Sequence, residues 1–287
     1  MSDVPSALHE YAKAFEAALP DFLPRAVYPV EQAMHYSMEA GGKRIRPALV
    51  LAFCELFGGD TEQAMPLAAA IEMVHCYSLI HDDLPCMDDD DFRRGKPSCH
   101  KQFGEATALL AGDALLTQAF WEADKVEGAV SILADLAGIH GMIGGQQLDL
   151  LYENKTISLN QLINMNQRKT GALFCAACRL GCLAAGVWNH DHDPERDVAE
   201  DYTGYLSVLF QLTDDILDVT GNSEALGKTI GKDEAAGKST WVSILGLEQA
   251  QAQAQELAQS AREAIAPYAG PGHFLYDLPE WLITREH

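Results

Sequence analysis

The stretch from Leu67 to Asp91 reads LAAAIEMVHCYSLIHDDLPCMDDDD and joins an apolar run to an acidic one. Residues Leu67 to Leu84 contain no Gly or Pro and are rich in Ala, Ile, Leu and Met, which favours a long helix. The acidic run, His81 to Asp91, is interrupted by Pro85. Because Pro lacks an N–H and clashes with the preceding turn, we expect the helix to bend or end near Pro85.

The rest of the chain shows a similar helical pattern. Between Ile244 and Ile265, apolar residues recur at the three-to-four spacing of one helical face. They are Leu247, Ala250, Ala254, Leu257 and Ala261. No segment alternates apolar and polar residues for long enough to predict a sheet, and no Gly/Pro break is long enough for a linker. We therefore predict an all-α fold with a single domain over residues 1–287.

Composition excludes several classes of protein. The chain has 287 residues and a formal net charge of −22, which argues against a partner that is a nucleic acid or an anionic membrane. Apolar runs such as Ala64–Ile71 are too short for a transmembrane segment, which needs about 20 residues. The first twenty residues lack the basic-then-apolar pattern of a secretory signal. Seven cysteines without a framework spacing suit reduced thiols, so we predict a cytoplasmic protein.

The few basic residues are concentrated in four short windows. More than half of the 20 Lys and Arg residues lie in Lys43/Arg44/Arg46, Arg93/Arg94/Lys96, Arg168/Lys169 and Lys228/Lys232/Lys238. Solvated surfaces also cluster charge, so an ordinary exposed face is one explanation. The other is a site for a small polyanion within an acidic chain.

A second acidic run, Gln211 to Asp218, lies inside the apolar segment Tyr205–Val219. Asp214 and Asp218 are four residues apart and share a face if the segment is helical. Burying like charges together is costly unless a positive charge compensates them. The donors are all oxygens, which favours a hard ion such as Mg²⁺ over Zn²⁺.

In the first acidic run, Asp82 and Asp88 would lie about 120° apart on a straight helix, at about 100° per residue. A break at Pro85 lets them converge. Taken alone, this run is explained as well by an acidic helix end with a solvated loop. Two such runs together with four cationic windows favour a site for a metal and a polyanion.

Several motifs resemble those of the trans-prenyltransferases, the polyprenyl synthase family. His81–Asp88 followed by Arg93–Pro97 resembles the first aspartate-rich motif, and Gln211–Asp218 resembles the second. Further blocks follow in the family's order: Gly41–Pro47, Gly144–Gln146, Lys169–Gly171 and Gly237–Thr240. The resemblance covers roughly residues 30 to 250 and is strongest to the short-chain farnesyl diphosphate synthases of bacteria.

The resemblance implies an isoprenoid-synthase-type helical bundle with a central active-site cavity, homodimeric in the family. It implies that an allylic diphosphate ionises to a carbocation, which isopentenyl diphosphate attacks before a proton is lost. From dimethylallyl or geranyl diphosphate the implied product is (2E,6E)-farnesyl diphosphate. Three Mg²⁺ ions, or Mn²⁺ in their place, would neutralise the charge developing on the leaving group.

The same resemblance assigns the site residues. The metal ligands and their neighbours would be Asp82, Asp83, Asp88, Asp214, Asp215 and Asp218. The allylic diphosphate would bind Arg93, Lys169, Lys228 and Lys238, with Thr170 and Gln211 supplying polar oxygens near the cation. Isopentenyl diphosphate would bind Lys43, Arg46, His75 and Arg94 without metal, a role that suits the planar Arg fork. From the sequence alone, His75 is more often a buried core histidine.

Product length is predicted from the residues just before Asp82. Ser78 and Tyr77 lie about 6–7.5 Å deeper along a helix, at about 1.5 Å per residue. The Tyr77 ring would form a floor beneath the growing chain, while Ser78 leaves room for more than C10. This pairing, with the extra residues Pro85 and Cys86, resembles family members that stop at C15. The alternative is that Tyr77 serves only in helix packing.

Three alternatives stay open. The product could be geranyl or geranylgeranyl diphosphate. A terpene cyclase would use a similar fold without needing Lys43, Arg46 and Arg94 for a second diphosphate. A non-catalytic subunit that regulates a partner synthase would have lost aspartates or arginines, and both motifs are intact here.

Overall fold

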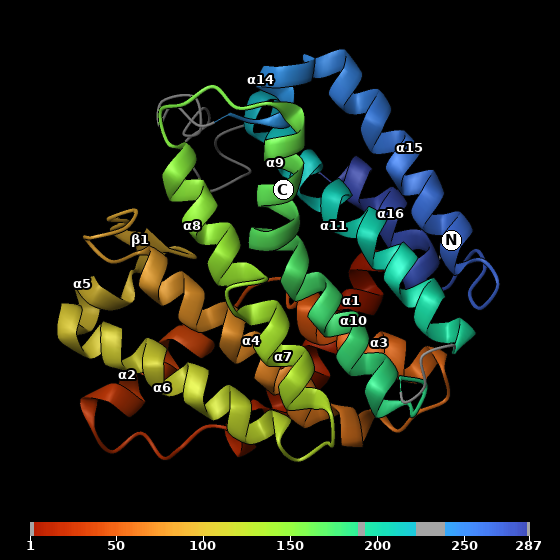
Figure 1. The fold of residues 1–287 in the computed structure, drawn as a ribbon. Coiled ribbons are helices and arrows are strands. Elements are labelled where there is room, and N and C mark those ends of the chain that lie inside the picture. Colours follow the sequence, from red (N-terminus) through yellow and green to blue (C-terminus); the bar gives the residue numbers. More distant parts are fainter. Residues whose placement is uncertain (1–2, 189–192, 222–238, 286–287) are drawn as a thin grey trace.

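The computed structural model describes residues 3–188, 193–221 and 239–285, and it is an all-α fold (Figure 1). The first helices are α1 (Val4–Ala18), α2 (Pro29–Met38), α3 (Ile45–Leu56) and α4 (Thr61–Asp82), with a 3-10 turn at Leu19–Asp21. Next come α5 (Cys99–Phe103), α6 (Glu105–Ala123), α7 (Ala129–Ala137), α8 (Met142–Tyr152), α9 (Leu159–Asn166), a π-helical segment at Gln167–Gly171, and α10 (Ala172–Ala184). The last are α11 (Pro194–Thr220), α14 (Trp241–Leu245), α15 (Leu247–Ile265) and α16 (Phe274–Thr284).

Helix α4 lies inside the bundle, packed against α3, α6 and α10. It begins after Asp60, whose carboxylate accepts a hydrogen bond from the Glu62 N–H at 3.0 Å and so caps the first turn. Every residue from Leu67 to Val74 is buried, on all sides of the helix. A helix that is apolar all round belongs in the core. The predicted helix is therefore confirmed, although it ends at Asp82 rather than at Leu84.

A small antiparallel hairpin follows the first acidic run. Its strands are β1 (Phe92–Arg93) and β2 (Lys96–Pro97), and Arg94 and Gly95 form the turn with φ of 54° and 75°. Two-residue hairpin turns of this kind need positive φ at both central positions. The sequence did not predict this hairpin, because two residues per strand are too few for an alternating pattern. It fixes the backbone of Arg93 and Arg94.

The prediction of one continuous helix from Ile244 to Ile265 is wrong at its start. Gly246, with φ of 81°, separates α14 from α15. The predicted Ala250, Ala254 and Ala261 are buried, together with Ala258 and Ile265. The predicted Leu257 is partly buried against the core, and Leu247, the first residue of α15, is half-buried. Alanines at the contact let α15 and α11 pack closely.

Close approach between α3 and α10 generates a prediction about stability. A Cβ on Gly181 would lie 2.5 Å from the carbonyl oxygen of Val50 and 2.8 Å from Phe53 Cβ. Gly181→Ala should therefore lower the free energy of unfolding by about 1–3 kcal/mol, because the two helices must move apart. Urea denaturation measures this.

Gly204 in α11 is the matched control, because a Cβ there would meet nothing within 4 Å. Gly204→Ala should leave stability unchanged or raise it by up to about 1 kcal/mol, through helix propensity. Equal stability of the two variants would contradict the close contact.

Candidate active site

The first acidic run turns back on itself where the sequence predicts a break. Helix α4 ends at Asp82, and Pro85 lies in the turn that follows. The Asp88 N–H donates to the Asp82 carbonyl oxygen at 2.8 Å, so the chain returns to the end of the helix. This turn brings Asp82 and Asp88 together, and the predicted helix end between them is confirmed.

Asp82 lies among other charged groups. Its Oδ1 accepts a hydrogen bond from Gln146 Nε2 on α8 at 2.5 Å. Burial raises the pKa of Asp82 to about 6, with the charges of Asp88 and Asp149 adding to the rise and those of Lys169 and Arg93 opposing it. A carboxylate whose charged form is disfavoured in this way gains from a nearby cation.

Asp83 has a different environment from Asp82, although the two are adjacent. It is buried, and both of its oxygens accept hydrogen bonds from Arg93, with Nε at 3.1 Å from Oδ1. Arg93 also lies 3.5 Å from Asp90. The pair therefore ties the hairpin to the end of α4.

In the second acidic run, three aspartates on α11 have three environments. Asp214 accepts a hydrogen bond from Arg285, just after α16, and its side chain is 44% exposed. Asp215 is buried and accepts hydrogen bonds from Gln211 Nε2 at 2.9 Å and from the Trp241 N–H at 2.8 Å. Asp218 is half-buried one turn beyond Asp214, on the same face of the confirmed helix.

A chain of side-chain contacts links the two acidic runs. Asp149, on α8 with Gln146, pairs with Lys169 in the π-helical segment. The next residue, Thr170, donates to Gln211 Oε1 on α11 at 3.1 Å. A Cβ on Gly145 would lie 2.1 Å from the Lys169 backbone nitrogen, so only glycine lets α8 approach this segment so closely. The structure thus gathers Asp82, Lys169, Thr170 and Gln211.

The structure also gathers the residues predicted to bind isopentenyl diphosphate. Arg46, in the first turn of α3, lies with its guanidinium 5.0 Å from the centre of the Phe174 ring. Burial and then the charges of Arg46 and Arg94 lower the pKa of His75 on α4 well below its ordinary value, so this imidazole is neutral at pH 7. Arg94 donates to the carbonyl oxygen of Gly41, two residues before the exposed Lys43. Three separate segments thus form one cationic group.

Tyr77 and Ser78 lie on α4, five and four residues before Asp82. Tyr77 is 5% exposed, and its ring packs edge-to-face with that of His81 at 5.7 Å. Its hydroxyl is buried and has no hydrogen-bond partner among the described residues. Ser78 is half-buried and donates to the His75 carbonyl oxygen at 2.9 Å. Burial and then the Asp82 charge raise the pKa of Tyr77 to about 12.

Sequence reasoning missed three residues of this region. Gln146 and Asp149 contact Asp82 and Lys169, and the Gly144–Gln146 block was their only signal. Arg285 contacts Asp214 from a part of the chain where the resemblance has faded, so no motif indicated it. Lys228 and Lys238 lie outside the described residues.

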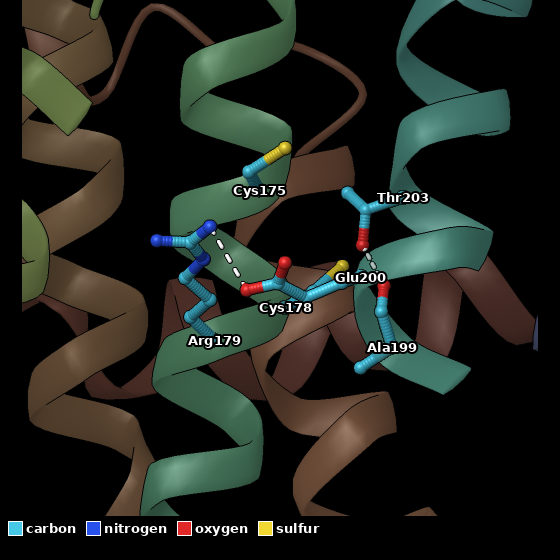
Figure 2. Close-up of a pocket in the computed structure, with 6 residues that line it drawn as sticks. All are labelled: Cys175, Cys178, Arg179, Ala199, Glu200 and Thr203. Carbon is cyan, nitrogen blue, oxygen red and sulfur yellow. Dashed lines mark hydrogen bonds and ion pairs between the residues drawn. The ribbon is translucent and has the colours of Figure 1, made fainter. Parts of the chain in front are cut away.

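A small hollow lies between α10 and α11 (Figure 2). It is lined by Cys175, Cys178, Arg179, Ala199, Glu200 and Thr203. Its cavity volume of about 30 Å³ is far below the roughly 300–1,000 Å³ usual for ligand pockets. Burial raises the pKa of Cys178 well above its ordinary value, so its thiol is protonated. Arg179 and Glu200 pair at 2.9 Å across the hollow. These groups serve in packing.

Comparison with known proteins decides the family. The family described as polyprenyl synthetase matches residues 28–266. The chain belongs to it. This polyprenyl synthetase is therefore a prenyltransferase.

Its relatives include several kinds of synthase. It is 46% identical to a farnesyl diphosphate synthase of Escherichia coli, over 93% of each chain, and 40% identical to that of Bacillus subtilis, over 98% of each. It is also 44% identical to a chloroplastic geranylgeranyl pyrophosphate synthase of Capsicum annuum, over 88% of this chain and 69% of that one. The crystal structure of a Helicobacter pylori geranyltransferase, complexed with magnesium and isoprenyl diphosphate, superimposes with a TM-score of 0.82 at 32% identity, over 99% of this chain and 97% of that one. No helix in the described parts of this polyprenyl synthetase is long and apolar enough to cross a membrane.

The raised pKa of Asp82 predicts that this residue destabilises the fold of the metal-free enzyme. The folded state binds the Asp82 proton more tightly than the unfolded state, so stability falls as pH rises from about 4 to about 6. Asp82→Asn keeps the size of the side chain and an oxygen that can accept the hydrogen bond from Gln146, and it removes the negative charge. It should raise the free energy of unfolding by about 1–3 kcal/mol at pH 8.

The measurement is thermal unfolding in EDTA at pH 5.5 and pH 8. The gain from Asp82→Asn should be smaller at pH 5.5, where Asp82 is largely protonated in the native protein. A variant less stable than the wild type at pH 8 would contradict the raised pKa.

Proposed function

We propose that this polyprenyl synthetase condenses isopentenyl diphosphate with dimethylallyl and then geranyl diphosphate to give (2E,6E)-farnesyl diphosphate. The observation that carries the proposal is the contact network that connects both acidic runs with Lys169 and Gln211. Beside it lies a separate group formed by the cations Arg46 and Arg94 and the neutral His75. Two anion sites of different composition suit two diphosphate substrates. A terpene cyclase has no use for the second one.

We further propose that Mg²⁺ binds at the allylic site. Asp82, Asp88 and Asp214 offer carboxylate oxygens, which suit a hard ion. Proteins usually bind Mg²⁺ through one or two carboxylates plus substrate phosphates, which these aspartates and an allylic diphosphate would supply together. When bound, Mg²⁺ supplies charge that stabilises the departing diphosphate. Three ions per site is the count that the family resemblance favours.

The protein's own groups perform the remaining steps. Lys169 and Arg93 would bind the allylic diphosphate, together with Lys228 and Lys238 outside the described residues. Thr170 and Gln211 would supply polar oxygens near the carbocation that remains when the carbon–oxygen bond breaks. Isopentenyl diphosphate would be held through its diphosphate by Lys43, Arg46, His75 and Arg94, so that its double bond can reach that cation. No side chain needs to act as the base, because the released diphosphate can accept the proton.

The enzyme is proposed to be a homodimer. Large apolar side chains are exposed on two helices that both contact α7. They are Leu109, Leu110 and Trp121 on α6, and Ile143 and Leu151 on α8, with Ile139 just before α8. Trp121 is 70% exposed, and exposed large apolar side chains in such number favour a protein interface. Sedimentation at micromolar concentration tests the proposal, since a monomer of 31.3 kDa would refute it.

Seven free cysteines are consistent with the proposed cytoplasmic location.

The function is tested by incubating the purified enzyme with isopentenyl diphosphate and either dimethylallyl or geranyl diphosphate. We expect a C15 diphosphate by mass spectrometry, with activity lost in excess EDTA and restored by Mg²⁺. Full activity in EDTA would refute the metal. No turnover of either pair would favour the non-catalytic regulatory subunit, and C10 or C20 products would favour geranyl or geranylgeranyl diphosphate synthase.

The proposed C15 product depends on Tyr77 and Ser78. Tyr77→Ala opens the space below Asp82 and should shift products toward C20, whereas Ser78→Phe fills it one residue higher and should shift them toward C10. Mass spectrometry of the products measures both. If both variants release only the wild-type product, the floor of the cavity lies elsewhere and Tyr77 serves in helix packing.

A further inference from the structure

A buried ion pair lies beside the proposed isopentenyl diphosphate site. Arg44 Nη1 lies 2.6 Å from Glu72 Oε1, and the two side chains are only 1% and 3% exposed. Arg44 Nη2 donates to the carbonyl oxygen of Met38, the last residue of α2, at 2.5 Å. Its Nε lies 3.4 Å from the partly exposed Glu16 on α1. Arg44 therefore connects α1, α2 and α4 at the start of α3.

The backbone at Arg44 is in a conformation that needs such support. Its φ of 51° is left-handed, which costs a non-glycine residue about 1–2 kcal/mol. The guanidinium contacts hold it there. Arg44 lies between Lys43 and Arg46 in the chain. Lys43 is exposed, whereas Arg46 is in the first turn of α3 and contacts the Phe174 ring. It thus occupies the turn between two proposed ligands of one diphosphate.

Glu72 is held by Arg44, which is only two residues before Arg46 in the chain, and its charge acts on both other arginines of this group. Burial lowers the pKa of Arg46 to about 10 and also lowers that of Arg94, and in both cases Glu72 is the strongest influence that raises it again. Glu72 is one turn before His75 on α4. A buried carboxylate in this position competes with a substrate diphosphate for guanidinium groups, unless another cation holds it.

We propose that Arg44 is a positioning residue that engages Glu72 and keeps this carboxylate from pairing with Arg46 and Arg94. Both arginines then keep their guanidinium groups available for the diphosphate of isopentenyl diphosphate. The inference rests on the proposed function, since it concerns the second substrate of that reaction. It explains why a carboxylate is retained within a site that must bind an anion: with Arg44 it forms a neutral pair.

The proposal predicts opposite effects for the two partners. In Arg44→Gln, Glu72 loses its counter-ion and should pair with Arg46 or Arg94 instead. Affinity for isopentenyl diphosphate, measured by calorimetry and as KM, should fall about tenfold or more, as expected for losing a charged hydrogen-bonding partner. The KM for geranyl diphosphate should change little. Glu72→Gln removes the competitor, so affinity for isopentenyl diphosphate should be unchanged or tighter.

The double variant Arg44→Gln/Glu72→Gln separates this role from a merely structural one. It should regain most of the affinity lost in Arg44→Gln, because no carboxylate remains to compete. If the pair only holds helices together, Glu72→Gln should weaken binding and the double variant should be no better than Arg44→Gln. That result would overturn the proposal. Glu16→Gln is the control, since Glu16 is 49% exposed and touches only the Nε side of Arg44. It should bind like the wild type.

Failure of this inference can be told from failure of the proposed function. Calorimetry with isopentenyl diphosphate reports on Arg44 even if the enzyme turns over no substrate. Wild-type catalysis with unaltered binding in Arg44→Gln would overturn the inference alone. If Arg44→Gln does not fold, Glu72→Gln decides by itself, because weaker binding in that variant refutes the competition.

Discussion

Compensation of charge is the constraint on which the rest of this structure depends. Carboxylates at the end of α4 and within α11 are brought into a helical bundle where water is scarce, and each needs a partner of positive charge or a hydrogen-bond donor. Three carboxylates of the site form ion pairs: Asp83 with Arg93, Asp149 with Lys169, and Asp214 with Arg285. Asp215 accepts hydrogen bonds from the Gln211 amide and the Trp241 backbone N–H. Asp82 has only the Gln146 amide as a hydrogen-bond partner in the described chain, and its pKa is raised accordingly. Asp82 is therefore well placed to gain from a bound cation.

The bundle supplies this arrangement through helix ends and close helix contacts. Helix α4 delivers Asp82 at its last residue, and the turn at Pro85 returns the chain to it. Gly145 lets α8 approach the π-helical segment, so that Asp149 and Lys169 can pair. A π-helical segment inside a helix often marks a functional position. Here it presents two consecutive residues, Lys169 to Asp149 on α8 and Thr170 to Gln211 on α11. One segment thus connects α8, which contacts Asp82 through Gln146, with the helix of the second acidic run.

Local patterns predicted the helices, the end of α4 near Pro85 and the shared face of Asp214 and Asp218, because each depends on residues close in sequence. The sequence did not predict the opposite environments of Asp82 and Asp83. These depend on which face of α4 meets α8 and which meets the hairpin, and α4 is apolar on all sides, so periodicity does not distinguish its faces. Nor did it predict the partner of Arg44, which looks like one more cation in a basic window. Only the fold shows that Glu72, 28 residues later, neutralises it. A charge count along the chain thus overestimates the cations available to a ligand.

Arg285 shows how the same balance connects the C-terminal helix to the second acidic run. Its side chain is 2% exposed and lies 4.7 Å from the centre of the Phe210 ring, so it is held in place by packing as well as by charge. It donates to Oδ1 of Asp214 and to Thr213, 71 and 72 residues earlier in the chain. Asp214 nevertheless stays 44% exposed, so part of this carboxylate remains accessible to an ion. The buried Arg285 guanidinium binds one oxygen of Asp214 and so fixes the orientation of the carboxylate. It does not cover the exposed part of that carboxylate. Orientation of a proposed metal ligand on α11 thus depends on how α16 docks, which no motif around Asp214 encodes.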